Sequence, residues 1–206
     1  GRLVIPYVNV AATDHTREYW KSAWTDNGND SGVLTAQAPD WLVGHNVIKA
    51  DTQTNEGLRY VTFWDADWKD IVIRQAVDLI SRGYDGIFLD DTAAYHYIAT
   101  TENFGTVYEI SALMAQFIAE ISDAVHQINP SALIIGNSDP YMAGTVSVID
   151  SELKQKYLDS VDFHLLENKT SEEIQDGRKP YNGLSNLLIL DSDFNSEPQI
   201  YDKRAG

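Results

Sequence analysis

The chain has 206 residues, 43% of them hydrophobic and 11% aromatic, so its composition predicts a folded globular protein rather than a disordered one. Its 31 acidic and 15 basic residues give a formal net charge of -16, which disfavours nucleic acid and anionic membranes as partners and suits a neutral or cationic substrate. The absence of cysteine excludes disulfides and thiolate catalysis, and no apolar run approaches the roughly 18 residues of a membrane span.

Strand and helix signals alternate along the first half of the chain. In chain order the pattern predicts a β-rich run at 3–10, a short helix at 17–24, a polar loop at 26–40, a short strand at 60–63, a helix at 68–80 and a buried strand at 86–89. Asp65 stands ahead of the first long helix as its N-cap, and Gly83 follows its end.

The second half continues the alternation. Thr106 and Glu109 form a capping box that predicts the start of a second long helix, and Asn129-Pro130 ends it. Short apolar strands follow at 132–136, 161–166 and 187–190. Short apolar strands separated by helices are typical of an α/β protein whose parallel sheet is covered on both faces. No linker or repeat interrupts the pattern, so we expect residues 1–206 to form a single domain.

Polar residues stand at or just beyond the ends of these strands: Asn9, Asp90, Asp91, Asn137, Glu167 and Asp191. In parallel α/β folds and barrels the carboxyl ends of the strands host the active site. Asp90 and Glu167 are the candidate catalytic pair, because glycoside hydrolysis commonly needs one carboxyl group to protonate the leaving oxygen and another to attack or to activate water. The other four are candidates to bind substrate.

Three of these strand-end candidates also have a plain structural alternative. Asp90 would then cap the following loop, Glu167 would be an exposed strand-end charge, and Asp91 would be either a partner of Asp90 or a loop cap. Trp64 and Tyr95 are candidates to stack on a sugar face, although core packing is the commoner role of an aromatic side chain.

The sequence predicts no metal site and no cofactor. The histidines show no metal-ligand spacing. Two Asp-x-Asp patterns, at 65–67 and 191–193, are compatible with a metal-dependent sugar transferase, but the pattern is short and Asp65 is better explained as a helix cap.

Several phrases taken together carry a resemblance to a known family. In order they are Tyr7-Val8-Asn9-Val10, Arg17-Glu18-Tyr19-Trp20-Lys21, Pro39-Asp40-Trp41-Leu42, Phe63-Trp64-Asp65-Ala66-Asp67-Trp68-Lys69-Asp70-Ile71 and Gly83-Tyr84-Asp85-Gly86-Ile87-Phe88-Leu89-Asp90. The chain resembles glycoside hydrolase family 114, the endo-α-1,4-polygalactosaminidases, most densely over residues 7–95. The resemblance implies a TIM-type (β/α) barrel, cleavage of galactosamine-containing polysaccharide, and a secreted or cell-surface location. It also implies that Asp90 and Glu167 match the family's two catalytic acids.

Two departures from the family keep further alternatives open. Relatives often carry Gly-Glu where this chain has Ala11-Ala12, which motivates a second hypothesis: a carbohydrate-binding barrel that has lost turnover. Only about the third to seventh barrel strands are recognisable, so we expect a partial or truncated barrel that is a piece of a longer chain. The oligomeric state, the exact sugar and the stereochemistry of cleavage stay open.

Overall fold

The computed structural model describes residues 2–47, 58–167, 184, 187–190 and 199–201. The main sheet has the strand order β1-β5-β6-β7-β8-β9, and a smaller sheet has the order β2-β4-β3. The strands of the main sheet are β1 (Tyr7–Asn9), β5 (Gly86–Asp90), β6 (Leu133–Asn137), β7 (Phe163–Glu167), β8 (Leu187–Leu190) and β9 (Gln199–Tyr201). Adjacent strands from β1 to β8 are parallel, and β9 is antiparallel to β8.

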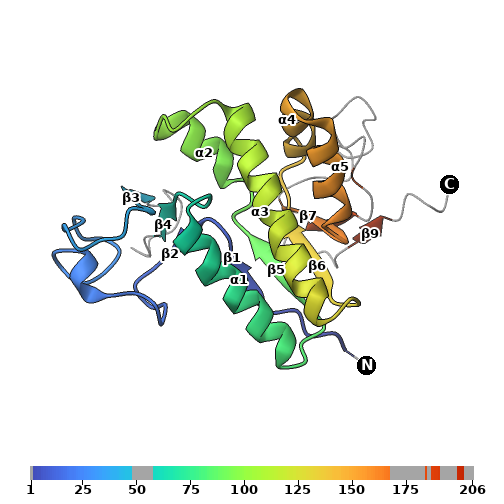
Figure 1. The fold of residues 1–206 in the computed structure, drawn as a ribbon, viewed down its shortest axis with the longest axis horizontal. Helices are drawn as coiled ribbons and strands as arrows, with labels where there is room; N and C mark the ends of the chain where they lie inside the picture. The colour runs from blue at the N-terminus through green and yellow to red at the C-terminus, as the bar shows by residue number, and fades with distance from the viewer. Residues whose placement is uncertain (1, 48–57, 168–183, 185–186, 191–198, 202–206) are drawn as a thin grey trace.

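The smaller sheet is antiparallel and consists of β2 (Ala12–Thr13), β3 (Leu42–Val47) and β4 (Leu58–Val61). The helices are η1 (a 3-10 turn, Ser22–Trp24), α1 (Ala66–Ser81), α2 (Ala94–Thr101), α3 (Val107–Ile128), α4 (Met142–Ile149) and α5 (Ser151–Asp159). Figure 1 shows α1, α3 and α5 lying in front of the main sheet. No helix in the described residues is both long and apolar enough to cross a membrane.

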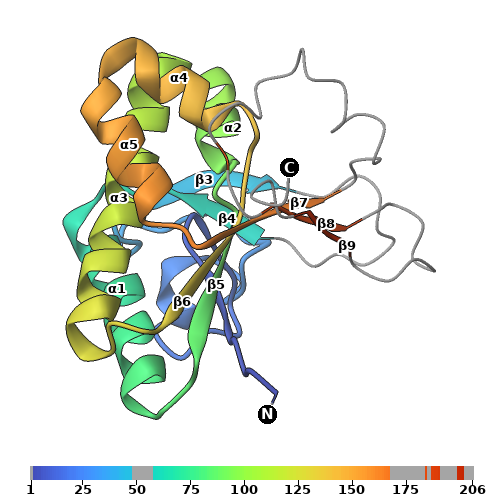
Figure 2. The same ribbon diagram turned by 90° about the vertical axis from the view of Figure 1, so that its right-hand side faces the viewer.

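Among the described residues the helices cover one face of the main sheet, whereas the sequence predicts a sheet covered on both faces. Figure 2 shows α1, α3, α4 and α5 together on one side of the strands. The physical reason is the period-2 burial of the strands: Ile87 and Leu89 are buried in the core with the helices, whereas Phe88 and Asp90 are only partly buried on the opposite face. Helices on one face of a parallel sheet are the arrangement of a barrel wall. In the described part of the chain β1 and β9 are the two edges of this sheet, so barrel closure is not seen.

The two long helices begin where the sequence predicts. The Asp65 side chain accepts hydrogen bonds from the N–H groups of Asp67 and Trp68, at 2.9 and 3.4 Å. At the start of α3, Thr106 Oγ1 accepts from the Glu109 N–H at 3.2 Å, and Glu109 Oε2 accepts from the Thr106 N–H at 2.9 Å. Caps of this kind satisfy backbone donors that have no partner within the helix, so both are confirmed as start signals.

Other elements differ from the prediction or were missed. Residues 17–24 form turns and the short η1 instead of a helix, and the strand expected at 60–63 is β4, which belongs to the small sheet. The N-terminal strand is limited to β1, but the chain before it still follows β5, because Pro6 O accepts from the Phe88 N–H at 2.8 Å. The remaining elements, α2, α4, α5, β2, β3 and β9, were not predicted.

Residues 11–47 and 58–65 lie between β1 and α1, and we call them the insertion. A run of packed indole rings connects its interior to α1, with centroid distances of 5.3 Å for Trp20–Trp24, 5.3 Å for Trp24–Trp41 and 5.0 Å for Trp41–Trp68, the last ring lying on α1. The Trp68 Nε1–H donates to Val10 O at 2.8 Å and ties this run to the end of β1. Because the insertion starts where β1 ends, it lies at the carboxyl edge of the main sheet, the same end as α2 (Figure 2).

Candidate active site

Asp90 is the last residue of β5, and its carboxylate is held from both neighbouring strands. Tyr7 Oη, from β1, donates to Asp90 Oδ2 at 2.8 Å, and Asn137 Nδ2, from β6, donates to Asp90 Oδ1 at 2.8 Å. The strands are parallel, so their carboxyl ends meet and bring together residues far apart in sequence. The structure therefore joins two predicted site residues, Asp90 and Asn137, and adds Tyr7.

Asn9, at the end of β1, has all its side-chain groups engaged and is only 7% exposed. Its Oδ1 accepts from the backbone N–H groups of Ala11 and Ala12 at 3.0 and 2.7 Å. Its Nδ2 donates to Tyr7 Oη at 3.0 Å and to Asp91 Oδ2 at 2.6 Å. Asn9 and Asp91, both predicted to bind substrate, are thus linked to each other and to the partner of Asp90.

Asp91 adopts a left-handed backbone conformation, with a φ of 59°. A non-glycine residue pays roughly 1 kcal/mol for this region. The turn removes Asp91 from the strict alternation of the strand, so that two consecutive acidic side chains both reach partners on β1. The result is a pair of neighbouring carboxylates at the sheet edge.

These carboxylates help to raise the pKa of the neighbouring tyrosines, Tyr7 and Tyr60. Burial, followed by the hydrogen bond to Asp90 and the charge of Asp90, raises the pKa of Tyr7 well above its usual range. Burial, followed by the charge of Asp91 and lesser effects of Tyr97 and Asp90, raises the pKa of Tyr60 to about 12. Both phenols are therefore protonated at neutral pH and available as hydrogen-bond donors.

Aromatic rings gather at the same edge. Tyr60, from β4 of the insertion, packs against Tyr97 of α2 with ring centroids 4.7 Å apart. Trp64 is partly exposed and contacts Phe63 and Phe104 edge-on, at 5.0 and 5.5 Å. Partly exposed aromatic faces beside carboxylates are suited to sugar rings, whose C–H faces pack on π-systems. Sequence reasoning missed Tyr60, because it lies in a different sheet from Asp90.

Tyr95 is placed differently from the prediction that it contacts a sugar. Its side chain is 1% exposed, and its Oη donates to Asp139 Oδ2 at 2.6 Å. Burial and this bond raise the pKa of Tyr95 well above its usual range. The ring has no open face for stacking, so Tyr95 supports the loop after β6 instead.

A buried polar contact lies behind Asn137. Ser138 Oγ and His164 Nδ1 are 2.8 Å apart, and both residues are buried. Burial lowers the pKa of His164 to about 4, so the imidazole is neutral near pH 7. Thr92 Oγ1 donates to Asn137 O and joins the loop after β5 to the end of β6. These contacts fix the backbone that carries Asn137.

Glu167 is placed by its backbone alone. Glu167 is the last residue of β7, with its Cα paired to that of Leu190. Its backbone therefore ends at the same edge of the sheet as Asp90, with β6 between the two strands. The side chain of Glu167, and Asp191 as a whole, lie outside the described residues, so pairing of Asp90 with Glu167 stays a prediction.

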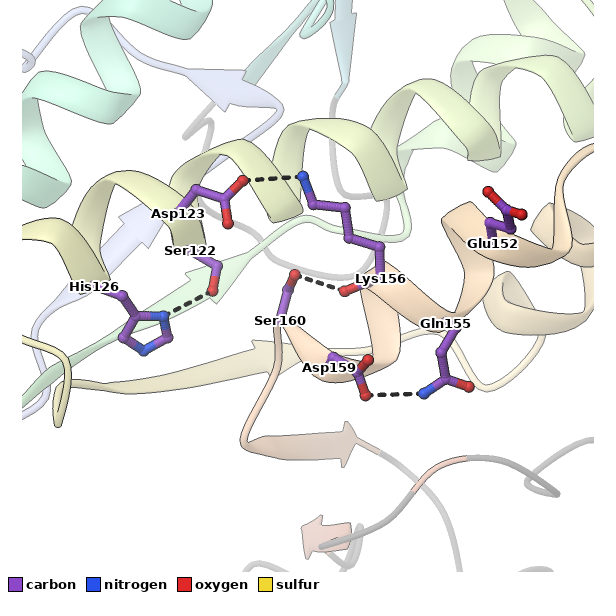
Figure 3. Close-up of a pocket in the computed structure, with 8 residues that line it drawn as sticks. All are labelled: Ser122, Asp123, His126, Glu152, Gln155, Lys156, Asp159 and Ser160. Carbon is purple, nitrogen blue, oxygen red and sulfur yellow. Dashed lines mark hydrogen bonds and ion pairs between the residues drawn. The ribbon is translucent and has the colours of Figure 1, made fainter.

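Across the described ranges, no group of three or more His, Asp or Glu side chains is arranged to hold a metal ion. A groove of about 510 Å³ lies between α3 and α5 (Figure 3). Three pairs of its polar groups contact each other: Lys156 Nζ and Asp123 at 2.9 Å, Gln155 Nε2 and Asp159 at 2.8 Å, and Ser122 Oγ and His126 Nδ1 at 3.2 Å. The groove lies in the helix layer, whereas the Asp90 carboxylate lies on the opposite face of the sheet.

No protein-family model matches the chain. It is 29% identical over 157 residues to an uncharacterized protein of Thermotoga maritima, covering 71% of this chain and 43% of that protein. It is 25% identical over 158 residues to an uncharacterized protein of Deinococcus radiodurans, covering 74% of this chain and 44% of that protein. The chain thus spans less than half the length of these two curated relatives.

The solved structures that match the chain include a glycoside hydrolase domain and a complex with galactosamine. The glycoside hydrolase domain of PelA from Pseudomonas aeruginosa has a TM-score of 0.45 and 11% identity, covering 97% of this chain and 82% of that one. Aspergillus fumigatus Ega3, in complex with galactosamine, has a TM-score of 0.45 and 12% identity, covering 98% of this chain and 79% of that one.

Proposed function

We propose that this chain carries the active site of a glycoside hydrolase that cleaves α-1,4-linked galactosamine-type polysaccharide, with Asp90 and Glu167 as its carboxyl pair. One observation carries the proposal. The Asp90 carboxylate lies at the carboxyl end of a parallel strand. Each of its oxygens accepts a hydrogen bond from an adjacent strand, one from Tyr7 on β1 and one from Asn137 on β6. A carboxylate held in this way at this edge of an α/β sheet is what carboxylate-based catalysis requires.

The hydrogen bonds of Asp90 also favour one assignment of catalytic roles to the two acids. Asp90 accepts from Tyr7 and Asn137, so its oxygens act as acceptors toward the protein. A general acid must instead present a proton to the leaving oxygen. We therefore assign Asp90 the role of the carboxylate that attacks the sugar or activates water, and Glu167 the role of the acid.

Substrate binding is assigned to groups at the same edge. The rings of Tyr60, Tyr97 and Trp64 supply faces for sugar stacking, and Asp91 together with the net charge of -16 favours a cationic sugar. The family resemblance of residues 7–95 supports galactosamine as that sugar and a secreted or cell-surface location. We further propose that residues 1–206 form a single catalytic barrel domain, present here as part of a longer chain.

A carbohydrate-binding barrel without turnover is the second candidate, and Ala11 and Ala12 favour it. Both side chains are buried, at 0% and 1% exposure, so they bring no polar group to the edge where relatives often carry a glutamate. Their backbone N–H groups nevertheless hold Asn9 in place. The two candidates therefore differ in turnover, not in the site's architecture.

Hydrolysis of an α-1,4-galactosamine-containing polymer separates them. The wild type is expected to release oligosaccharides, and the isosteric variant Asp90→Asn to be slower by roughly 10²- to 10⁴-fold. Asp78→Asn, an exposed aspartate paired with Arg82 on α1, is the matched control and should retain full activity. Equal release by wild type and Asp90→Asn would remove Asp90 from catalysis, and tight binding without release by the wild type would establish the binding barrel.

A further inference from the structure

We propose that Asn9 is a positioning residue that sets the direction of the hydrogen bond from Tyr7 to Asp90, acting through the Tyr7 hydroxyl. This inference rests on the proposed function, since it assigns Asn9 to the orientation of the catalytic carboxylate in place of the sugar contact expected from its position. It is carried by four hydrogen bonds that all meet at one buried amide.

The orientation of the Asn9 amide is fixed by two backbone N–H groups. Backbone N–H groups can only donate, and those of Ala11 and Ala12 both point to Asn9 Oδ1, at 3.0 and 2.7 Å. An amide turned the other way would place its NH₂ group against two donors. The NH₂ group of Asn9 must therefore face the sheet edge.

This orientation in turn fixes the Tyr7 hydroxyl. A phenol has one hydrogen to donate, and Asn9 Nδ2 already occupies an acceptor site on Tyr7 Oη, at 3.0 Å. The carboxylate oxygen of Asp90, 2.8 Å away, is an acceptor, so the Tyr7 hydrogen points to it. Asp90 Oδ2 is thus held as an acceptor by a chain that begins at the backbone of the insertion.

The second hydrogen of the same NH₂ group goes to Asp91 Oδ2, at 2.6 Å. One amide therefore serves both carboxylates, one directly and one through Tyr7. Ala11 and Ala12 contribute to the site through their backbone rather than through their side chains. The loss of a polar side chain at these positions does not by itself disable the arrangement.

The first test uses catalysis in Asn9→Asp and Tyr7→Phe. Asn9→Asp is isosteric and keeps an acceptor for the N–H groups of Ala11 and Ala12, but it cannot donate to Tyr7 as the amide does. We expect each variant to lower kcat roughly 100-fold and to keep KM within a few-fold of wild type. The reason is that the Asp90 carboxylate loses its orientation while the contacts that bind substrate remain. Asn9 also donates directly to Asp91, so the double variant is compared with Tyr7→Phe in an Asp91→Ala background, which removes that bond. In this background the double variant should be no slower than Tyr7→Phe, because Asn9 acts on Asp90 through Tyr7. Multiplying losses in the double variant would overturn the proposal.

The second test does not depend on turnover, so it separates failure of this inference from failure of the proposed function. In a ¹⁵N-labelled chain the two NH₂ protons of Asn9 form one signal pair, identified by its absence in Asn9→Asp. Tyr7→Phe is expected to move one of these protons upfield, and Asp91→Ala the other. If neither proton responds, the amide does not face Tyr7 and Asp91, and the inference falls even when the enzyme is active. If both respond in a chain that cleaves nothing, the hydrogen-bond chain stands and the hydrolase assignment falls.

Discussion

Replacement of Arg59 by methionine is expected to weaken the insertion severely. Arg59 lies on β4, is 2% exposed, and directs its guanidinium at backbone carbonyls: Asp30 O at 2.6 Å, Val43 O at 3.2 Å, and Gly32 O. Methionine has a similar length and fills the space, but it donates no hydrogen bond. The substitution therefore leaves three buried carbonyl groups without this donor.

The size of the effect follows from that count. A buried polar group left unsatisfied costs about 1–3 kcal/mol, which gives about 3–9 kcal/mol for three carbonyls. Removing a buried charge recovers several kcal/mol of desolvation, so we expect a net loss near the lower end, about 3 kcal/mol. In a chain of this size that corresponds to a fall in Tm of roughly 6–12 °C.

Urea unfolding of Arg59→Met and of a matched control measures this loss. Arg74→Met makes the same replacement on α1, where the side chain is 70% exposed and pairs with Asp70 at 2.8 Å. An exposed pair of this kind contributes about 0.3–0.5 kcal/mol. If the two variants lose the same free energy of unfolding, the three carbonyls are satisfied without Arg59 and the reasoning is refuted.

Three further predictions concern pH, a helix cap and substrate affinity. Because the pKa of His164 is lowered to about 4, its neutral form stabilises the fold above about pH 6.5, and this contribution is lost as the pH falls toward 4. Urea unfolding should therefore show about 2 kcal/mol more loss between pH 6.5 and pH 5 for wild type than for His164→Gln; equal losses would exclude the imidazole as the cause. Thr106→Ala removes half of the capping box with Glu109 and should cost about 1 kcal/mol in thermal unfolding, and no change would show that the cap is dispensable. Trp64→Ala should raise KM on the polymer roughly ten-fold or more while kcat changes little; an unchanged KM would exclude Trp64 from substrate binding.

The parts of the fold that could be predicted depend on local signals. The start of α1 at Asp65 and of α3 at Thr106 follow from caps that act within three residues, and the apolar spacing behind them is unambiguous. Helix α2 was missed because its N-cap position, Ala93, makes no side-chain cap and nothing marks its start. The position of the helices relative to the sheet depended on which strand residues stay partly exposed, and a short apolar run such as 86–89 does not reveal this.

The candidate site shows the same division. The position of Asp90 at the end of β5 was predictable, because the end of a buried strand is marked by local sequence. Its contacts were not, since Tyr7 lies 83 residues away and Asn137 lies 47 residues away, and only the parallel register brings them together. Tyr95 was misjudged because its nearness to Asp90 in sequence says nothing about the direction of its ring, which points into the core.

The run of indole rings that connects the insertion to α1 determines what optical measurements on this protein will report. The chain has five tryptophans, and Trp20, Trp24, Trp41 and Trp68 stand in ring contact one after another. Intrinsic fluorescence will therefore be dominated by energy exchanged among these rings, whereas far-UV circular dichroism follows α1 and α3. Coincident unfolding curves from the two signals would show that the insertion and the helix layer unfold as one cooperative unit. An earlier fluorescence transition would show that the insertion, which lies beside Asp90, unfolds separately from the helix layer.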